Sequence, residues 1–144
     1  CDIIAVFTTQ EEVGVRGATV SAFSVAPDEG IALDVTVAGD IPELKLNAVK
    51  LGEGPAVKIK DARSISNPEV VRRMLAAARA AGVACQREVL PYGGTDAGAM
   101  QLSRGGMPVG TLSIPCRYVH SACETIDLGD MDGALKLLKE YVRM

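Results

Sequence analysis

Runs of apolar residues alternate with segments of helical periodicity along the whole chain. The apolar runs predict strands at residues 2–9, 31–37, 56–59, 83–90 and 108–114. The periodic segments predict helices at residues 18–25, 68–81, 96–104 and 131–142. Because strands that alternate with helices are typical of an α/β fold, we predict a three-layer sandwich in which helices cover both faces of a central mixed sheet.

The starts of two helices are marked by capping residues. Asn67 precedes Pro68 and Glu69, which places a side-chain acceptor, a proline and an acid in the order that favours a helix start. Asp130 is expected to cap the last helix, which then turns its apolar side chains inward: Leu135, Leu138 and Val142.

Composition and charge narrow the classes of protein. The 144 residues are 48% hydrophobic, enough for one core, and no linker or repeat divides them. The net charge is −3 and Lys and Arg form no cluster, which argues against a nucleic-acid partner. The longest uncharged stretch, residues 105–116, is too short to cross a bilayer, so no membrane association is expected. We expect a soluble, cytoplasmic protein.

Two features concern the cysteines and the start of the chain. The four cysteines, Cys1, Cys85, Cys116 and Cys123, have no Cys-x-x-Cys spacing and are expected to be reduced. The chain opens directly into a core-type strand without an initiator Met. We therefore expect residues 1–144 to be the C-terminal portion of a longer polypeptide.

Acidic residues lie where predicted strands end. Glu11 and Glu12 follow the apolar run 3–7, and Gly14 and Gly17 permit the chain to turn so that both carboxylates share one site. Because buried ionised carboxylates are costly without a cation or donor, this pair suggests a metal.

Asp34 and His120 are further candidate ligands. Asp34 is the only charged residue in residues 31–37, and His120, the only histidine, follows the strand predicted at residues 108–114. Imidazole and carboxylates together suit zinc, cobalt or manganese. Considered alone, His120 could instead be an ordinary surface or hydrogen-bonded histidine, and Asp34 could form a structural salt bridge.

Several motifs in register resemble one known family. Residues 10–18, 34–40, 50–55, 94–97 and 115–121 read QEEVGVRGA, DVTVAGD, KLGEGP, GTDA and PCRYVHS. They are similar to the M42 metallopeptidases, the dinuclear aminopeptidases that form tetrahedral particles and include proteins once labelled endoglucanases. The resemblance covers essentially the whole chain.

The resemblance implies a role for each matching residue. Glu11 corresponds to the general base, Glu12 and His120 to ligands of one divalent ion, and Asp34 to a ligand of the other. It also implies two zinc or cobalt ions, peptide substrates and a dodecamer-type homo-oligomer. The family's first metal-binding histidine, its bridging aspartate and its inserted β-domain all precede these motifs. Residues 1–144 thus match the C-terminal portion of a single catalytic domain, which is expected to be inactive alone and to bind at most one ion weakly.

The remaining candidates have two readings each. Gly94, Thr95 and Asp96 match a family segment near the substrate pocket, but Thr95 or Asp96 is also a good helix cap. Arg117 could orient a peptide carboxylate or pair with a carboxylate of the scaffold.

Other functions remain as alternatives. The chain could be a truncated, non-catalytic relative that acts as an assembly or binding module, or part of a metal-dependent deacylase or endoglucanase. The combination of histidine and carboxylates argues against a glycosidase, which needs two carboxylates around the sugar and no metal.

Overall fold

The computed structural model describes residues 2–42, 44 and 48–144. Cys1 lies outside these residues, and Cys85, Cys116 and Cys123 are free thiols. In the described part of the chain, no helix has the length and apolar character needed to cross a membrane.

The helices are α1 (Arg16–Val25), α2 (Pro68–Ala80), α3 (Ala97–Met100) and α4 (Leu128–Tyr141). The strands are β1 (Gly30–Val37), β2 (Ala56–Lys60), β3 (Gln86–Val89), β4 (Val109–Arg117) and β5 (Thr125–Ile126).

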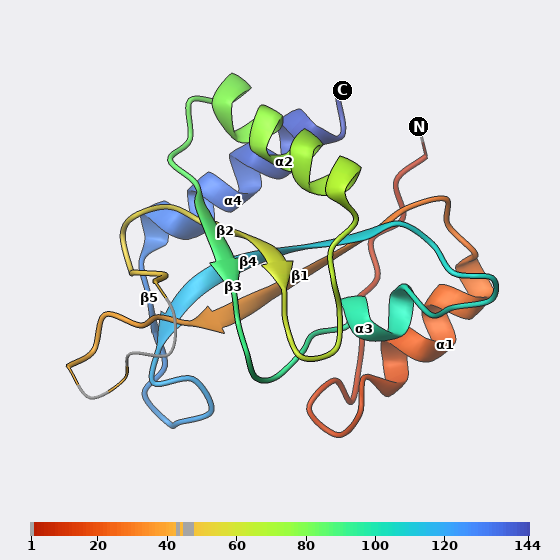
Figure 1. Ribbon diagram of the computed structural model, residues 1–144, viewed down its shortest axis with the longest axis horizontal. Coiled ribbons are helices and arrows are strands. Elements are labelled where there is room, and N and C mark those ends of the chain that lie inside the picture. The colour runs from red at the N-terminus through yellow and green to blue at the C-terminus, as the bar shows by residue number, and fades with distance from the viewer. Residues whose placement is uncertain (1, 43, 45–47) are drawn as a thin grey trace.

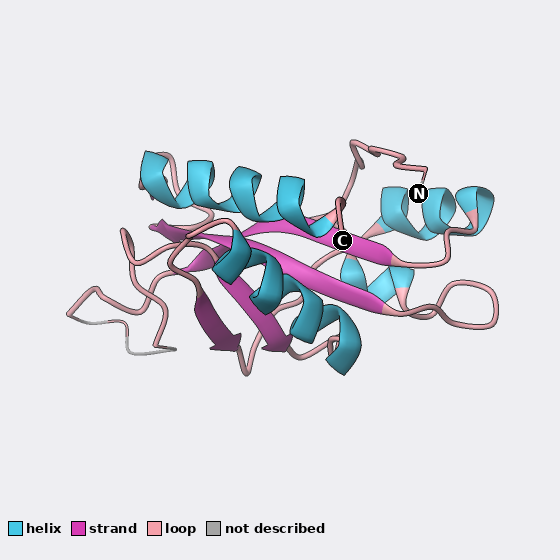
Figure 2. Ribbon diagram, turned by 90° about the horizontal axis from the view of Figure 1, so that it is seen from above, coloured by secondary structure: helices cyan, strands magenta, loops and turns pink. Residues whose placement is uncertain are grey.

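One mixed sheet forms the middle layer. Its order is β1-β4-β2-β3, and β5 pairs with β4. β4 runs parallel to β1 and antiparallel to β2, while β2 and β3 are parallel. α2 and α4 pack together on one face, and α1 and α3 lie on the other (Figures 1 and 2). The predicted three-layer α/β sandwich is confirmed.

The main core lies between the sheet and the α2–α4 pair. Val57 of β2 and Leu112 of β4 pack against Met74 of α2 and Leu137 of α4, all fully buried. The start of α2 is as predicted, because the Asn67 carboxamide oxygen accepts hydrogen bonds from the amides of Glu69 and Val70.

The cap predicted for α4 was wrong, and the predicted inward face was correct only at Leu138. The helix begins earlier, and Asp127 caps it by accepting from the Gly129 amide at 2.7 Å. Its buried apolar side chains are Ala134, Leu137 and Tyr141, and Leu138 packs against the same core, whereas Leu135 and Val142 are exposed. Gly133 lies against Pro55 and Val83, and a Cβ at Gly133 would meet them at 3.0 and 3.1 Å. The small residues 133 and 134 therefore allow this face of α4 to pack closely against its neighbours.

Asp130 has a different role from the predicted cap. Its carboxylate is 1% exposed and accepts hydrogen bonds from the Gly54 amide at 2.7 Å and the Gly52 amide at 2.8 Å. Asp130 therefore fastens the loop before β2 to the first turn of α4.

The first predicted strand is absent. Residues 2–9 are extended but form no strand, and the side chains of Ile3, Ile4 and Phe7 are exposed. A strand exists only through its pairing, and within the described residues no neighbouring strand accepts or donates hydrogen bonds to this segment. The predicted helix 96–104 shortens to α3, and the two-residue β5 was not predicted.

The first testable prediction concerns Asp130. Asp130→Ala removes two charge-assisted hydrogen bonds and leaves two loop amides without their acceptor, so the free energy of unfolding should fall by about 2–4 kcal/mol. Urea denaturation measures the change. Asp132→Ala, which removes only an exposed ion pair with Lys136, is the matched control and should change it by less than about 0.5 kcal/mol. Equal effects of the two substitutions would contradict this role of Asp130.

Candidate functional site

A tight turn carries Glu11 and Glu12. The Glu11 carbonyl accepts hydrogen bonds from the amides of Gly14 and Val15, and the Thr9 carbonyl accepts one from the Gly17 amide at 3.0 Å. Gly14 has φ +120°, and a Cβ at Gly17 would lie 2.6 Å from the Thr9 backbone. The two glycines thus permit the turn, one by its conformation and the other by close approach.

Glu12 and His120 lie in direct contact. His120 Nε2 is 3.1 Å from one Glu12 carboxylate oxygen and 3.2 Å from the other, although the two residues are 108 positions apart. Both side chains are 70% exposed. The expected burial of Glu12 at the end of a buried strand was therefore wrong, because residues 2–9 form no buried strand.

The loop after β4 orients the side chain of His120. Tyr118 and His120 both adopt left-handed backbone conformations, with φ 60° and 63°. The His120 amide donates to the Glu124 carboxylate at 2.6 Å, and the Ser121 amide donates to the Tyr118 carbonyl at 3.0 Å. These bonds close a turn that directs the imidazole toward Glu12.

Glu11 and Asp34 belong to the same electrostatic cluster. Burial is the largest cause that raises the pKa of Glu11, followed by the charges of Asp34, Glu12 and Asp96, while Arg63 lowers it. Burial also raises the pKa of Asp34, against the Val35 amide that donates to its carboxylate at 2.7 Å and the charge of Lys58. Burial and the charges of neighbouring acids thus both oppose ionisation of Glu11 and Asp34.

A buried polar layer beside Asp34 was not predicted. Asp34 pairs in register with Ser113, whose hydroxyl is buried and has no hydrogen-bond partner in the described structure. Further along the sheet, Lys58 and Glu88 form a buried ion pair at 3.2 Å. The Thr36 hydroxyl also donates to Glu88. The sequence signal was a charged residue between apolar neighbours, Val57 and Ile59, as in the case of Asp34.

The two polar residues before α3, Thr95 and Asp96, make different hydrogen bonds. The Thr95 hydroxyl accepts from the Ala97 amide and lies 3.3 Å from the Thr111 hydroxyl, so Thr95 provides the cap. The Asp96 carboxylate instead accepts from the Thr8 hydroxyl at 2.7 Å. Gly94 packs against Arg63, leaving no room for a Cβ.

Arg117 is engaged by the scaffold. Its guanidinium donates to both Asp40 carboxylate oxygens, at 2.7 and 3.0 Å. This bidentate bond lowers the pKa of Asp40. The arrangement matches the structural reading of Arg117 rather than a free group awaiting a substrate.

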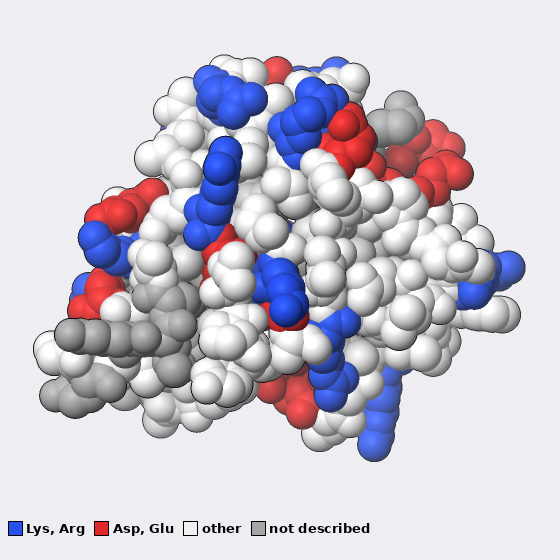
Figure 3. All heavy atoms as spheres, in the orientation of Figure 1, with Lys and Arg blue, Asp and Glu red and all other residues white. Residues whose placement is uncertain are grey.

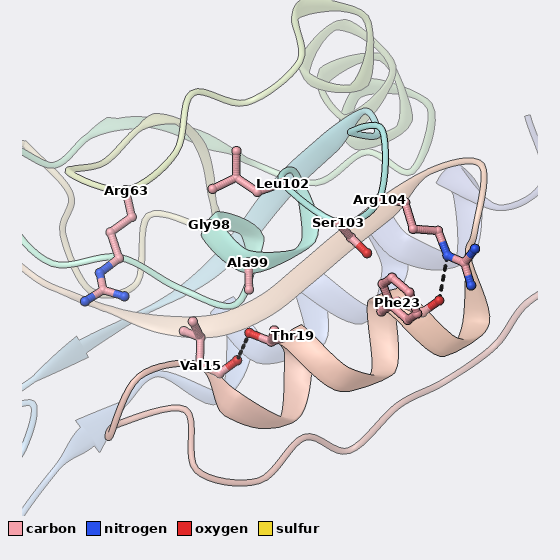
Figure 4. Close-up of a pocket in the computed structure, with 9 residues that line it drawn as sticks. All are labelled: Val15, Thr19, Phe23, Arg63, Gly98, Ala99, Leu102, Ser103 and Arg104. Carbon is pink, nitrogen blue, oxygen red and sulfur yellow. Dashed lines mark hydrogen bonds between the residues drawn. The ribbon is translucent and has the colours of Figure 1, made fainter.

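A hollow of about 500 Å³ lies between α1 and α3, beside the turn (Figure 4). At one end Arg104 stacks on the Phe23 ring and donates to the Phe23 carbonyl at 2.7 Å. None of the four candidate site residues lines this hollow. Its lining residues are Val15, Thr19, Phe23, Arg63, Gly98, Ala99, Leu102, Ser103 and Arg104.

Acidic and basic side chains share the face of the molecule drawn in Figure 3.

The donors suit a divalent ion in kind but not in number. Glu12 and His120 are close enough to bind one ion together, and carboxylate oxygen with imidazole nitrogen suits zinc or cobalt. Among the described residues, however, no cluster of three or more His, Cys, Asp or Glu side chains could hold a metal. A complete centre would require further ligands.

Comparison with known proteins gives consistent matches. A family model described as M42 glutamyl aminopeptidase matches residues 1–137. The chain is 48% identical to a protein of Acetivibrio thermocellus that has been assigned as an aminopeptidase, and 39% identical to a lysyl aminopeptidase of Pyrococcus furiosus. The structure matches that of the TET1 peptidase of Pyrococcus horikoshii, which can assemble into a tetrahedron or a large octahedral shell, with a TM-score of 0.79 and 33% identity.

These matches cover nearly all of the chain but a minor part of each relative. They include 98%, 96% and 93% of this chain, and 43%, 39% and 38% of the three other proteins, respectively. The chain therefore spans about two fifths of the length of the relatives it matches.

The second testable prediction concerns the pH dependence of stability. The folded state raises the pKa of Asp34 above its ordinary value of 3.8, so stability is fully present below that value and is lost as the pH rises through the folded pKa. Asp34→Asn removes this loss and should stabilise the chain relative to wild type at neutral pH. Urea denaturation from about pH 4 to about pH 7 measures the difference.

Asp40 provides the control of opposite sign. Arg117 lowers the pKa of Asp40, so its stabilising contribution is present above 3.8 and is lost as the pH falls through the folded pKa. Asp40→Asn should therefore destabilise the chain at neutral pH. The account of these charges is wrong if both substitutions change stability in the same direction.

Proposed function

Because this chain belongs to the M42 glutamyl aminopeptidase family, we propose that it contributes the general base and metal ligands of a metal-dependent aminopeptidase. The observation that carries the proposal is the contact of Glu12 with His120 at 3.1 Å, next to Glu11. Residues distant in sequence thus bring an imidazole and carboxylates to one place, as a metallohydrolase needs.

Each residue has a distinct task in this proposal. Glu12 and His120 hold one divalent ion, zinc or cobalt, and Asp34 is a ligand of the second. The bound ions would polarise the peptide carbonyl and make water acidic. A complete centre would need further ligands from outside the described residues. Because the described residues include no three-donor cluster, the chain by itself is proposed to bind at most one ion weakly and to be inactive.

Glu11 acts on protons rather than on the ion. Its carboxylate accepts a proton from the attacking water and delivers it to the leaving amine. Burial and the neighbouring acids raise the pKa of Glu11, which makes its carboxylate a stronger base than an ordinary glutamate. Glu12 touches His120 instead, so two adjacent glutamates have different environments and different tasks.

The substrate class is peptides with a free N-terminus. The relatives differ in the residue that their names specify, lysyl in the Pyrococcus furiosus protein and glutamyl in the family description. The shared reaction is hydrolysis of the first peptide bond, and the proposal concerns that reaction.

The complete protein is also proposed to be a homo-oligomer located in the cytoplasm. The Pyrococcus horikoshii relative assembles into closed particles. Exposed apolar side chains on α4, among them Leu128, Met131 and Leu135, offer surface for contacts between subunits. The free thiols of Cys85, Cys116 and Cys123 suit a reducing compartment.

A second candidate is a non-catalytic assembly or binding module. It is favoured by the absence of a three-donor cluster among the described residues. The two candidates separate when the complete natural polypeptide that contains these residues is loaded with zinc or cobalt and offered a diverse peptide panel. Release of N-terminal amino acids supports the peptidase, and no release from any peptide refutes it.

The third testable prediction separates the base from the ligands. In that complete polypeptide, Glu11→Gln should lower kcat by about 10²–10⁴-fold with nearly unchanged metal content, because glutamine cannot accept the proton. His120→Ala should instead lower the metal content, measured by elemental analysis after dialysis. The reverse pattern, metal loss in Glu11→Gln and full occupancy in His120→Ala, would refute the assigned roles.

A further inference from the structure

The Asp96 carboxylate is turned away from the helix that it precedes. α3 begins at Ala97, yet Asp96 makes no side-chain capping bond, because Thr95 accepts from the Ala97 amide instead. Asp96 Oδ2 accepts a hydrogen bond from the Thr8 hydroxyl at 2.7 Å, across 88 positions of sequence. Its other oxygen, Oδ1, is buried without a hydrogen-bond partner in the described structure. A buried carboxylate oxygen without a hydrogen bond lowers the stability of the fold, so its position calls for an explanation.

Thr8 belongs to a segment with few other attachments. Residues 2–9 form no strand, and the side chains of Ile3, Ile4 and Phe7 face solvent. Among the described residues, the bond from Thr8 to Asp96 is the only side-chain hydrogen bond made by residues 2–9. It therefore anchors this segment at the point where the chain enters the Glu11–Glu12 turn.

The anchor continues directly into the backbone of that turn. Thr9, the next residue, accepts the Gly17 amide at 3.0 Å, and Gln10 accepts the Arg16 amide at 3.3 Å. Gly17 packs so closely on Thr9 that a Cβ would lie 2.6 Å from its backbone nitrogen and oxygen. Because this contact is tightly packed, displacement of Thr8 would also displace the N-terminal side of the turn.

We propose that Thr8 and Asp96 are positioning residues that hold the Glu11–Glu12 turn in place, so that Glu12 meets His120. The inference deepens the proposed function and rests on it for its catalytic consequence. Asp96 acts through Thr8 on the turn and not on the reacting atoms.

Amide hydrogen exchange of the 144-residue chain, followed by NMR, tests the anchor without requiring activity or metal. Thr8→Val keeps the side-chain shape and removes the donor, so exchange at the amides of Arg16 and Gly17 should speed up roughly fivefold or more. Thr8→Ser retains the hydroxyl and should stay within about twofold of wild type. Thr9→Val is the matched control, because Thr9 contributes its backbone to the turn, and it should also stay within about twofold.

Asp96 enters the same test through a double-mutant cycle. Asp96→Ala should speed exchange at these two amides as much as Thr8→Val, and the double variant should add nothing, because both changes remove one bond. Additive effects of Thr8→Val and Asp96→Ala would overturn the proposal. So would wild-type exchange in Thr8→Val, or an equal acceleration at core amides such as that of Leu112.

The catalytic consequence is measured in the complete natural polypeptide. Thr8→Val should lower kcat roughly tenfold per folded molecule, with KM and metal content within about twofold of wild type, and Thr8→Ser should restore kcat. An unchanged kcat in Thr8→Val would overturn the positioning role. If the wild-type polypeptide hydrolyses no peptide, the proposed function fails, and the exchange experiment still decides whether the anchor holds the turn.

Discussion

The backbone pairing of β4 with β1 is the constraint on which the site depends. The two strands run parallel over the whole length of β1, from Gly30 opposite Val109 to Val37 opposite Cys116. Parallel strands finish at the same edge of a sheet, so the chain leaves β4 toward His120 close to the end of the strand that carries Asp34. β4 also pairs with β2 and β5, so every strand except β3 pairs directly with it. The Glu11–Glu12 turn completes the site from a separate segment.

The electrostatics of this edge oppose folding. Burial is the largest cause that raises the pKa values of Glu11 and Asp34, and the charges of Glu12 and Asp96 raise both further. Elsewhere the same sheet satisfies its buried charges internally, as Lys58 does with Glu88. The two regions therefore differ: Lys58 and Glu88 form a structural ion pair, whereas the acids around Glu11 and Asp34 lower the stability of the fold.

Local signals in the sequence predicted elements that are stabilised locally. α2 was placed almost correctly because Asn67 and Pro68 define its start and its apolar residues repeat with the helical period. Residues 2–9 have equally strong apolar character but form no strand, since pairing depends on a partner that periodicity cannot supply. For α4, the sequence favoured Asp130 as the cap, but the Asp130 carboxylate accepts from the amides of Gly52 and Gly54, which are distant in the chain, and Asp127 caps the helix instead.

The site was predictable only in part, for related reasons. The sequence identified Glu12 and His120 as partners through the resemblance, but not that both would be exposed and in contact. The bond between Thr8 and Asp96 and the unpartnered hydroxyl of Ser113 depend on register and three-dimensional proximity, which no local pattern encodes. For Arg117 the sequence favoured a carboxylate of the scaffold over a peptide carboxylate, but it did not identify the partner as Asp40.

The most direct test of the account is the anomalous diffraction of zinc in crystals of the complete natural polypeptide that contains these residues. The account predicts a zinc peak within about 2.0–2.2 Å of both a Glu12 carboxylate oxygen and His120 Nε2. A zinc ion bound elsewhere, with Glu12 and His120 apart and free of metal, would contradict it.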